Sequence, residues 1–85
     1  MRESDYQRKI IKKYEKQGYF VLKLIRTNIV GISDLLILKS NETPIFLECK
    51  TEKGKLSEIQ KYRLEELKKK GFEVFVSYGH EIKKV

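Results

Sequence analysis

Apolar and polar residues follow two different rhythms along the chain. From Tyr6 to Tyr14 the apolar positions have helical spacing, which indicates an amphipathic helix that ends near Gly18. A similar stripe after Ser57 predicts a second helix that ends near Gly71. Dense or alternating apolar runs predict strands at residues 19–26, 35–39, 45–50 and 72–78. The pattern therefore predicts the order helix, three strands, helix, strand.

The sequence also predicts where the helices begin and how the strands connect. Ser4 with Gln7, and Ser57 with Gln60, have the spacing of capping boxes. The crossover of about twenty residues through the second helix makes the last strand parallel to the third. We expect one α/β domain over residues 1–85, with a mixed four-stranded sheet flanked by helices that cover both faces. The tail after Gly79 leaves room for one further short element.

The second and third strands carry few charges, and these suggest a site. Glu48 and Lys50 lie on one face of their strand, and Cys49 points to the other. A turn with an odd number of residues places Asp34 opposite Lys50 and on the face of Glu48. A two-residue turn would place Asp34 on the other face. The intervening segment lacks the Asn-Gly or Asp-Gly of two-residue hairpins. We therefore expect one cluster, with Asp34 and Glu48 diagonal neighbours roughly 7 to 8 Å apart at the backbone.

Two carboxylates this close repel unless a cation lies between them. A hard divalent cation such as Mg²⁺ suits oxygen ligands and keeps water molecules for chemistry. Lys50 is then placed to orient an attacking water or to stabilise charge that builds on a phosphate. The alternative is structural: Glu48 and Lys50 form a solvent-facing pair on an edge strand, and Asp34 caps a turn.

The order of these residues resembles a known nuclease signature. Gly31-Ile32-Ser33-Asp34 is followed, fourteen residues after the aspartate, by Glu48-Cys49-Lys50. This resembles the PD-(D/E)xK nuclease superfamily and, more narrowly, the short phage-type form of the VRR-NUC (virus-type replication-repair nuclease) family. The resemblance covers nearly the whole chain and departs from the family pattern at Ser33, where proline is frequent. It implies a restriction-endonuclease-like αβββαβ core.

The resemblance also implies roles for individual residues in an Mg²⁺- or Mn²⁺-dependent endodeoxyribonuclease. Metal ligands would be Asp34, Glu48 and the backbone carbonyl of Cys49, and Lys50 would position the water. An acidic residue of the first helix would join them. Asp5 matches that position best, with Glu3 as the weaker alternative, although a carboxylate at Asp5 is also explained by the helix dipole alone.

A glutamine near the lysine is also functional in the resembled family. Gln60 matches it, and helix capping explains the same residue equally well. Further candidates for DNA contacts are Arg26, Ser33, Lys53 and Lys55. The two lysines flank Gly54 in a loop directly after the site. They could bind a phosphate backbone there, or they could simply be solvated charges.

Composition limits the class of protein. A net charge of +7 on 85 residues favours a polyanionic partner, nucleic acid before membrane. The single cysteine precludes an intramolecular disulfide, and no apolar run is long enough for a bilayer. We expect an intracellular, cytoplasmic protein. His80, the only histidine, has no ligand partner at a suitable spacing and is expected at the surface.

The small phage-type proteins that this chain resembles act as homodimers on branched DNA, including four-way junctions. The expected function is thus a homodimeric Holliday junction resolvase. Alternatives are a flap or nicking endonuclease, a non-catalytic module that binds DNA or junctions, and a regulatory partner of another component.

Overall fold

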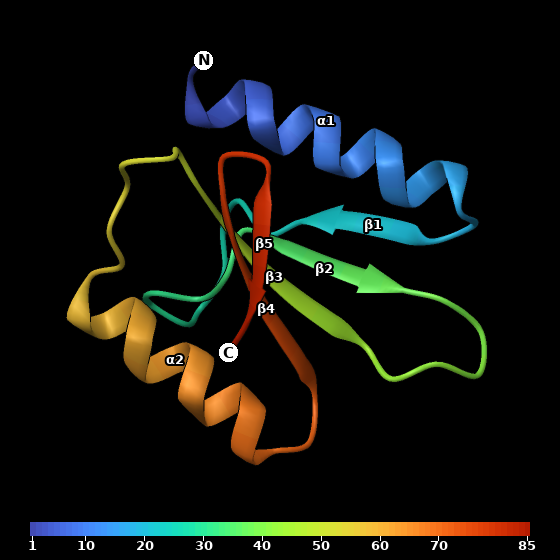
Figure 1. Ribbon diagram of the computed structural model, residues 1–85. Helices are drawn as coiled ribbons and strands as arrows, with labels where there is room; N and C mark the ends of the chain where they lie inside the picture. The colour runs from blue at the N-terminus through green and yellow to red at the C-terminus, as the bar shows by residue number, and fades with distance from the viewer.

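The computed structural model describes residues 1–85, with two helices and five strands. The elements are α1 (Glu3–Lys16), β1 (Phe20–Lys23), β2 (Leu35–Leu38), β3 (Ile45–Lys50), α2 (Glu58–Lys69), β4 (Glu73–Tyr78) and β5 (Glu81–Lys84). One sheet contains all the strands, in the order β1-β2-β3-β4-β5 (Figure 1). Only β3 and β4 run parallel; the other neighbours are antiparallel. The predicted α/β class, element order and parallel crossover are confirmed.

The sheet has five strands and not the predicted four. The additional strand, β5, forms a tight hairpin with β4 through Gly79, whose φ of +62° is in the left-handed region that glycine adopts readily. Ile82 is the only apolar residue of β5 and packs against the core. Because one apolar position gives no alternation, the sequence pattern carries little signal for this strand.

The two helices begin differently from each other. At α2, Ser57 is the N-cap as predicted: its Oγ accepts from the Gln60 amide N–H at 3.2 Å, and Gln60 Oε1 accepts from the Ser57 N–H at 2.9 Å. At α1 the N-cap is Arg2, so the prediction of Ser4 is wrong. Asp5, at the third helical position, has the role predicted for Gln7, because its Oδ2 accepts from the N–H of the N-cap residue Arg2 at 3.1 Å. Neither helix combines the length and apolar character that crossing a membrane requires.

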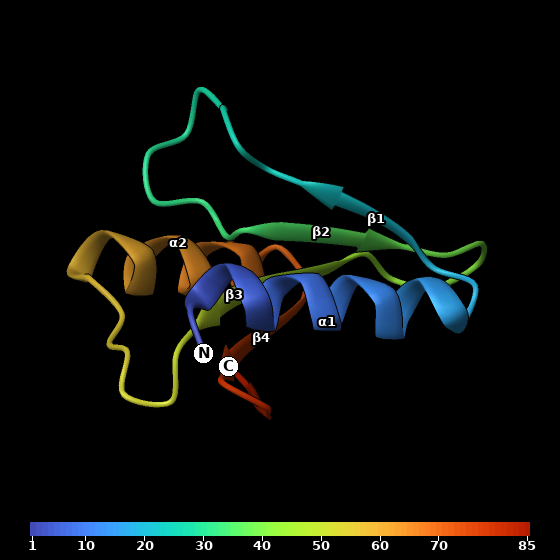
Figure 2. The same ribbon diagram turned by 90° about the horizontal axis from the view of Figure 1, so that it is seen from above.

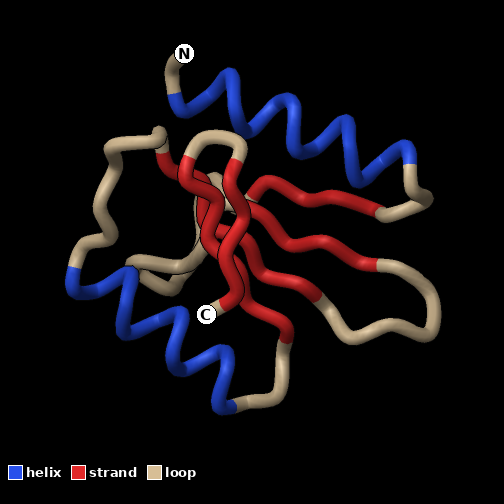
Figure 3. The backbone as a smooth tube through the Cα atoms, in the orientation of Figure 1, coloured by secondary structure: helices blue, strands red, loops and turns tan.

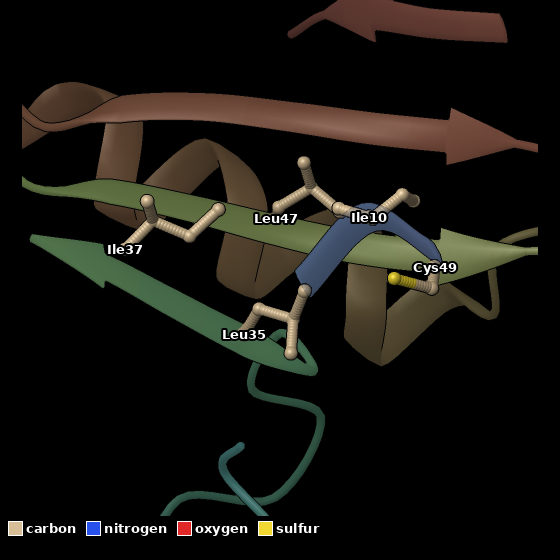
Figure 4. Packing of buried hydrophobic residues seen from close by; sticks show 5 residues of the cluster. All are labelled: Ile10, Leu35, Ile37, Leu47 and Cys49. Carbon is tan, nitrogen blue, oxygen red and sulfur yellow. The ribbon is translucent and has the colours of Figure 1, made fainter. Parts of the chain in front are cut away.

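The larger part of the core lies between α1 and one face of the sheet. Its buried members come from alternating positions of β2 and β3, together with one residue of α1: Ile10, Leu35, Ile37, Leu47 and Cys49 (Figure 4). Because strand residues alternate between faces, this set directs the intervening residues of both strands to the opposite face. That opposite face carries Asp34 and Glu48.

The opposite face is only partly covered. The helix α2 packs there over β4 through Leu64 and Leu67, and the two helices flank the strands (Figure 3). No helix covers the same face of β1, where the side chains of Phe20 and Leu22 are 64% and 38% exposed. The prediction that helices cover both faces is therefore wrong for this edge of the sheet. A single helix is about 10 Å wide, so α2 over β4 cannot also shield β1, which lies three strands away.

Candidate metal centre

The register of β2 and β3 brings Asp34 and Glu48 together. Leu35 pairs with Leu47 and Ile37 with Ile45, so one further step places Asp34 opposite Glu48. The predicted shared face is confirmed, whereas the predicted partner of Asp34, Lys50, is wrong by two residues. The register centres the turn on Asn41, which has a left-handed φ of +62°, and pairing ends at Ile37 and Ile45, next to Pro44, which has no N–H to donate.

Three carboxylates from different elements converge at this point. Glu3 comes from the first turn of α1, Asp34 from the residue before β2, and Glu48 from β3. One carboxylate oxygen of each lies within 4.8 Å of the others. Three negative groups at this separation repel strongly, which favours either protonation or a bound cation.

Glu48 is the residue that most clearly requires a partner. Its side chain is 2% exposed, and its Oε1 is buried without any hydrogen-bond partner. Burial, followed by the negative charge of neighbouring Asp34, raises the pKa of Glu48 to about 9, although Lys50 opposes the shift. A buried, unpartnered carboxylate oxygen is costly in a folded protein. A divalent cation would supply the missing interaction, and the oxygen donors present suit a hard ion such as Mg²⁺.

Asp34 and Cys49 are held together by a backbone contact. The Cys49 N–H donates to Asp34 Oδ2 at 2.8 Å, which fixes the carboxylate against β3. The N–H and C=O of one strand residue project to the same side, so the Cys49 carbonyl also faces Asp34. The side chain of Cys49 lies in the core, where burial raises the pKa of its thiol to about 12. Only the backbone of Cys49 is thus directed toward the carboxylates.

The acidic residue that α1 places in the cluster is Glu3, and the preference for Asp5 has no support in the geometry. Asp5 caps the helix, and the hydrogen bond from the Arg2 N–H, followed by the charges of Arg2 and of Arg8 at 3.4 Å, lowers the pKa of its carboxyl. The sequence feature that could have identified Glu3 is its spacing from the buried residues of the helix. It lies three residues before Tyr6 and seven before Ile10, both buried, and residues at this spacing share a helix face.

Gln60 and Lys50 are the two further predicted site residues next to the cluster. Gln60 Nε2 donates to Glu48 Oε2 at 3.4 Å, while the Gln60 side-chain oxygen accepts from the backbone of Ser57. Gln60 therefore both caps α2 and contacts the site, as its two interpretations proposed separately. Lys50 is half-buried, two residues beyond Glu48 on the same face of β3.

The predicted DNA contacts divide into accessible and inaccessible residues. Arg26 is exposed on the loop between β1 and β2, which projects from the sheet (Figure 2) and lines a groove with Asp34 and Gln60. Lys53 and Lys55 are exposed beyond β3. Ser33 is completely buried and donates its hydroxyl to the Leu35 carbonyl at 3.3 Å, so its prediction as a DNA contact is wrong.

A helix, three strands, a helix and further strands around a carboxylate cluster are consistent with a restriction-endonuclease-like core. This arrangement fits the nuclease-like class of α/β proteins. The sequence model of the VRR-NUC domain matches residues 6–81, and the chain belongs to this family of nuclease domains. Membership implies phosphodiester hydrolysis in DNA. The comparisons with curated proteins and with solved structures gave no match.

Proposed function

We propose that this domain is a Mg²⁺- or Mn²⁺-dependent endodeoxyribonuclease whose metal ligands are Glu3, Asp34, Glu48 and the backbone carbonyl of Cys49. The observation that carries the proposal is Glu48 Oε1, a buried carboxylate oxygen without a partner inside a cluster of three acids. When bound, the ion would lower the pKa of a coordinated water and polarise the phosphate. Family membership supports the same chemistry.

The remaining residues position these ligands and the reacting groups. The Cys49 N–H holds the Asp34 carboxylate, and the Gln60 amide holds one oxygen of Glu48. The Lys50 ammonium, on the face of Glu48, would orient the attacking water or stabilise the charge that develops on the phosphate. Arg26 in the groove, with Lys53 and Lys55 beyond it, would bind the DNA backbone.

The proposed substrate is branched DNA, and the proposed assembly is a homodimer that resolves Holliday junctions. Two cuts related by symmetry require two sites, which a two-fold dimer provides. The uncovered sheet face around Phe20 and Leu22 supports self-association, since large exposed apolar patches mark interaction surfaces. β1 is also an edge strand with a free row of backbone groups, able to pair with a second copy of itself.

Cleavage of a labelled four-way junction, compared with linear duplex and single strand, tests this function. Each substrate is incubated with Mg²⁺, with Mn²⁺ or with a chelator. Paired, symmetric, metal-dependent nicks confined to the junction are the expected result. Metal-dependent cleavage of flaps or nicked duplex would keep the nuclease and reject the resolvase. Binding without cleavage under every condition would instead support a non-catalytic DNA-binding module.

The oligomeric state is tested separately with Phe20→Glu, which places a charge on the uncovered face. Light scattering should give a dimer mass for the wild type and a monomer mass for this variant. Lys12→Glu, at an exposed position of α1, is the matched control and should remain dimeric. A wild type that is monomeric at high concentration would refute the homodimer without affecting the nuclease proposal.

A further inference from the structure

The fifth strand adds a positive charge to the sheet face that carries the metal centre. Glu48 pairs with Val76 on β4, and Val76 pairs with Lys83 on β5. Paired residues on neighbouring strands project from the same face, so Glu48 and Lys83 share a face two strands apart, on either side of Val76, which is buried beneath α2. With strands about 4.8 Å apart, their backbones are separated by roughly 10 Å.

A hollow lies between the β4–β5 hairpin and the loop that joins β3 to α2. Lys53, Lys55 and Lys83 contribute its positive charges, against Glu52 and Glu81. Two contacts connect it to the candidate metal centre. Gly54, which lines the hollow, packs so closely against Lys50 that a Cβ on the glycine would lie 2.9 Å from the Lys50 Cβ. Tyr78, which also lines the hollow, pairs with Lys50 in the sheet.

The two acidic residues leave the lysines available to an anion. Glu52 already accepts a hydrogen bond from the Tyr6 hydroxyl. Glu81 pairs with Lys83 at 3.3 Å, but the two side chains are 69% and 63% exposed. An ion pair with this much solvent contributes little stability, so a phosphate can replace Glu81 as the partner of Lys83.

We propose that Lys83, together with Lys53 and Lys55, binds the phosphate backbone of the DNA segment next to the scissile bond. This inference rests on the proposed nuclease function, because the metal centre defines where the cut lies. It gives the β4–β5 hairpin a role in holding the substrate.

Lys83→Ala and Lys84→Ala are a matched pair that tests this surface. Lys84 is the next residue of the same strand, faces the other side of the sheet and lies 3.5 Å from Glu73. The affinity for a fluorescein-labelled duplex is measured by anisotropy over a range of salt concentrations in metal-free buffer. Lys83→Ala should reduce the slope of log affinity against log salt by about one, and Lys84→Ala should keep the wild-type slope. Glu81→Gln should strengthen binding, because Lys83 loses its competing partner.

The outcomes separate this inference from the nuclease itself. Equal slopes for the wild type and Lys83→Ala, in a protein that cleaves DNA, would overturn the hairpin surface and leave the nuclease intact. A reduced slope for Lys83→Ala alone, in a protein that cleaves no DNA with any metal, would support the surface and refute the nuclease.

Discussion

Two glutamates only four residues apart, at the end of β3 and in the loop that follows it, have opposite environments. Glu48 is 2% exposed, with an unpartnered oxygen and a pKa raised to about 9 by burial. Glu52 is exposed, and the hydrogen bond from the Tyr6 hydroxyl lowers the pKa of its carboxyl. The same side chain thus serves as a candidate metal ligand at one position and as an anchor for a loop at the other.

This difference shows that the tertiary surroundings, and not the residue type, set the chemistry. Glu48 lies beside Asp34 and Glu3, so it is surrounded by negative charge that a cation would neutralise. Glu52 connects its loop to α1 and packs closely against the hairpin, since a Cβ on Gly79 would lie 2.6 Å from Glu52 Cγ.

The largest expected effect is that of Glu48→Gln, with Glu52→Gln as the comparison. Glu48→Gln should reduce cleavage by at least about 10³-fold, roughly 4 kcal/mol of transition-state stabilisation, because a metal ligand is lost. Glu52→Gln should keep cleavage within about tenfold of the wild type, since it weakens one hydrogen bond outside the cluster. Single-turnover cleavage with saturating Mg²⁺ measures both. Similar losses in the two variants would remove the distinction between the glutamates.

The next effect distinguishes the two acids of α1. Glu3→Gln should lower metal affinity or cleavage by about 10- to 100-fold, because Glu3 contributes an oxygen to the cluster. Asp5→Asn should preserve cleavage and slightly lower the melting temperature, since it weakens the helix cap. Calorimetric titration with Mn²⁺ and thermal unfolding provide the readouts. Loss of metal binding in Asp5→Asn but not in Glu3→Gln would reverse the assignment.

The raised pKa of Glu48 predicts a pH dependence with a definite sign. Between its ordinary value of 4.5 and about 9, the folded metal-free protein binds a proton at Glu48 that the unfolded chain has released. The free energy of unfolding should therefore fall as the pH rises through this range. Metal binding must displace the proton, so Mg²⁺ affinity should rise with pH up to about 9. Urea unfolding at several pH values tests the trend, which Glu48→Gln should abolish.

The smallest effect separates the two roles of Gln60. Gln60→Glu keeps the capping box but removes the amide that donates to Glu48, so cleavage should fall by about tenfold with little change in stability. Ser57→Ala removes the cap, which should cost about 1 kcal/mol of stability and leave cleavage near the wild-type rate. Cleavage rates and urea unfolding of both variants make the comparison. A catalytic defect in Ser57→Ala equal to that in Gln60→Glu would mean that the cap alone positions the site.

Features that depend on neighbours along the chain were predictable from the order of the residues. Helical spacing, strand alternation and the capping box at Ser57 and Gln60 all follow from local geometry. The shared face of Asp34 and Glu48 required only that the turn between their strands contain an odd number of residues. These interactions need no information about distant segments, which is why the motif and the core architecture were predictable.

Which distant residues meet could be known only from the packing of the folded chain. It brought Glu3 to the carboxylates in place of Asp5, buried Ser33, added β5 to the sheet and left β1 uncovered. Each outcome depends on how a helix or hairpin packs on the sheet, through contacts between segments far apart in sequence. A carboxylate in the first turn of a helix can either cap the helix or bind a metal. The packing of α1 on the sheet decides which of its carboxylates faces the cluster.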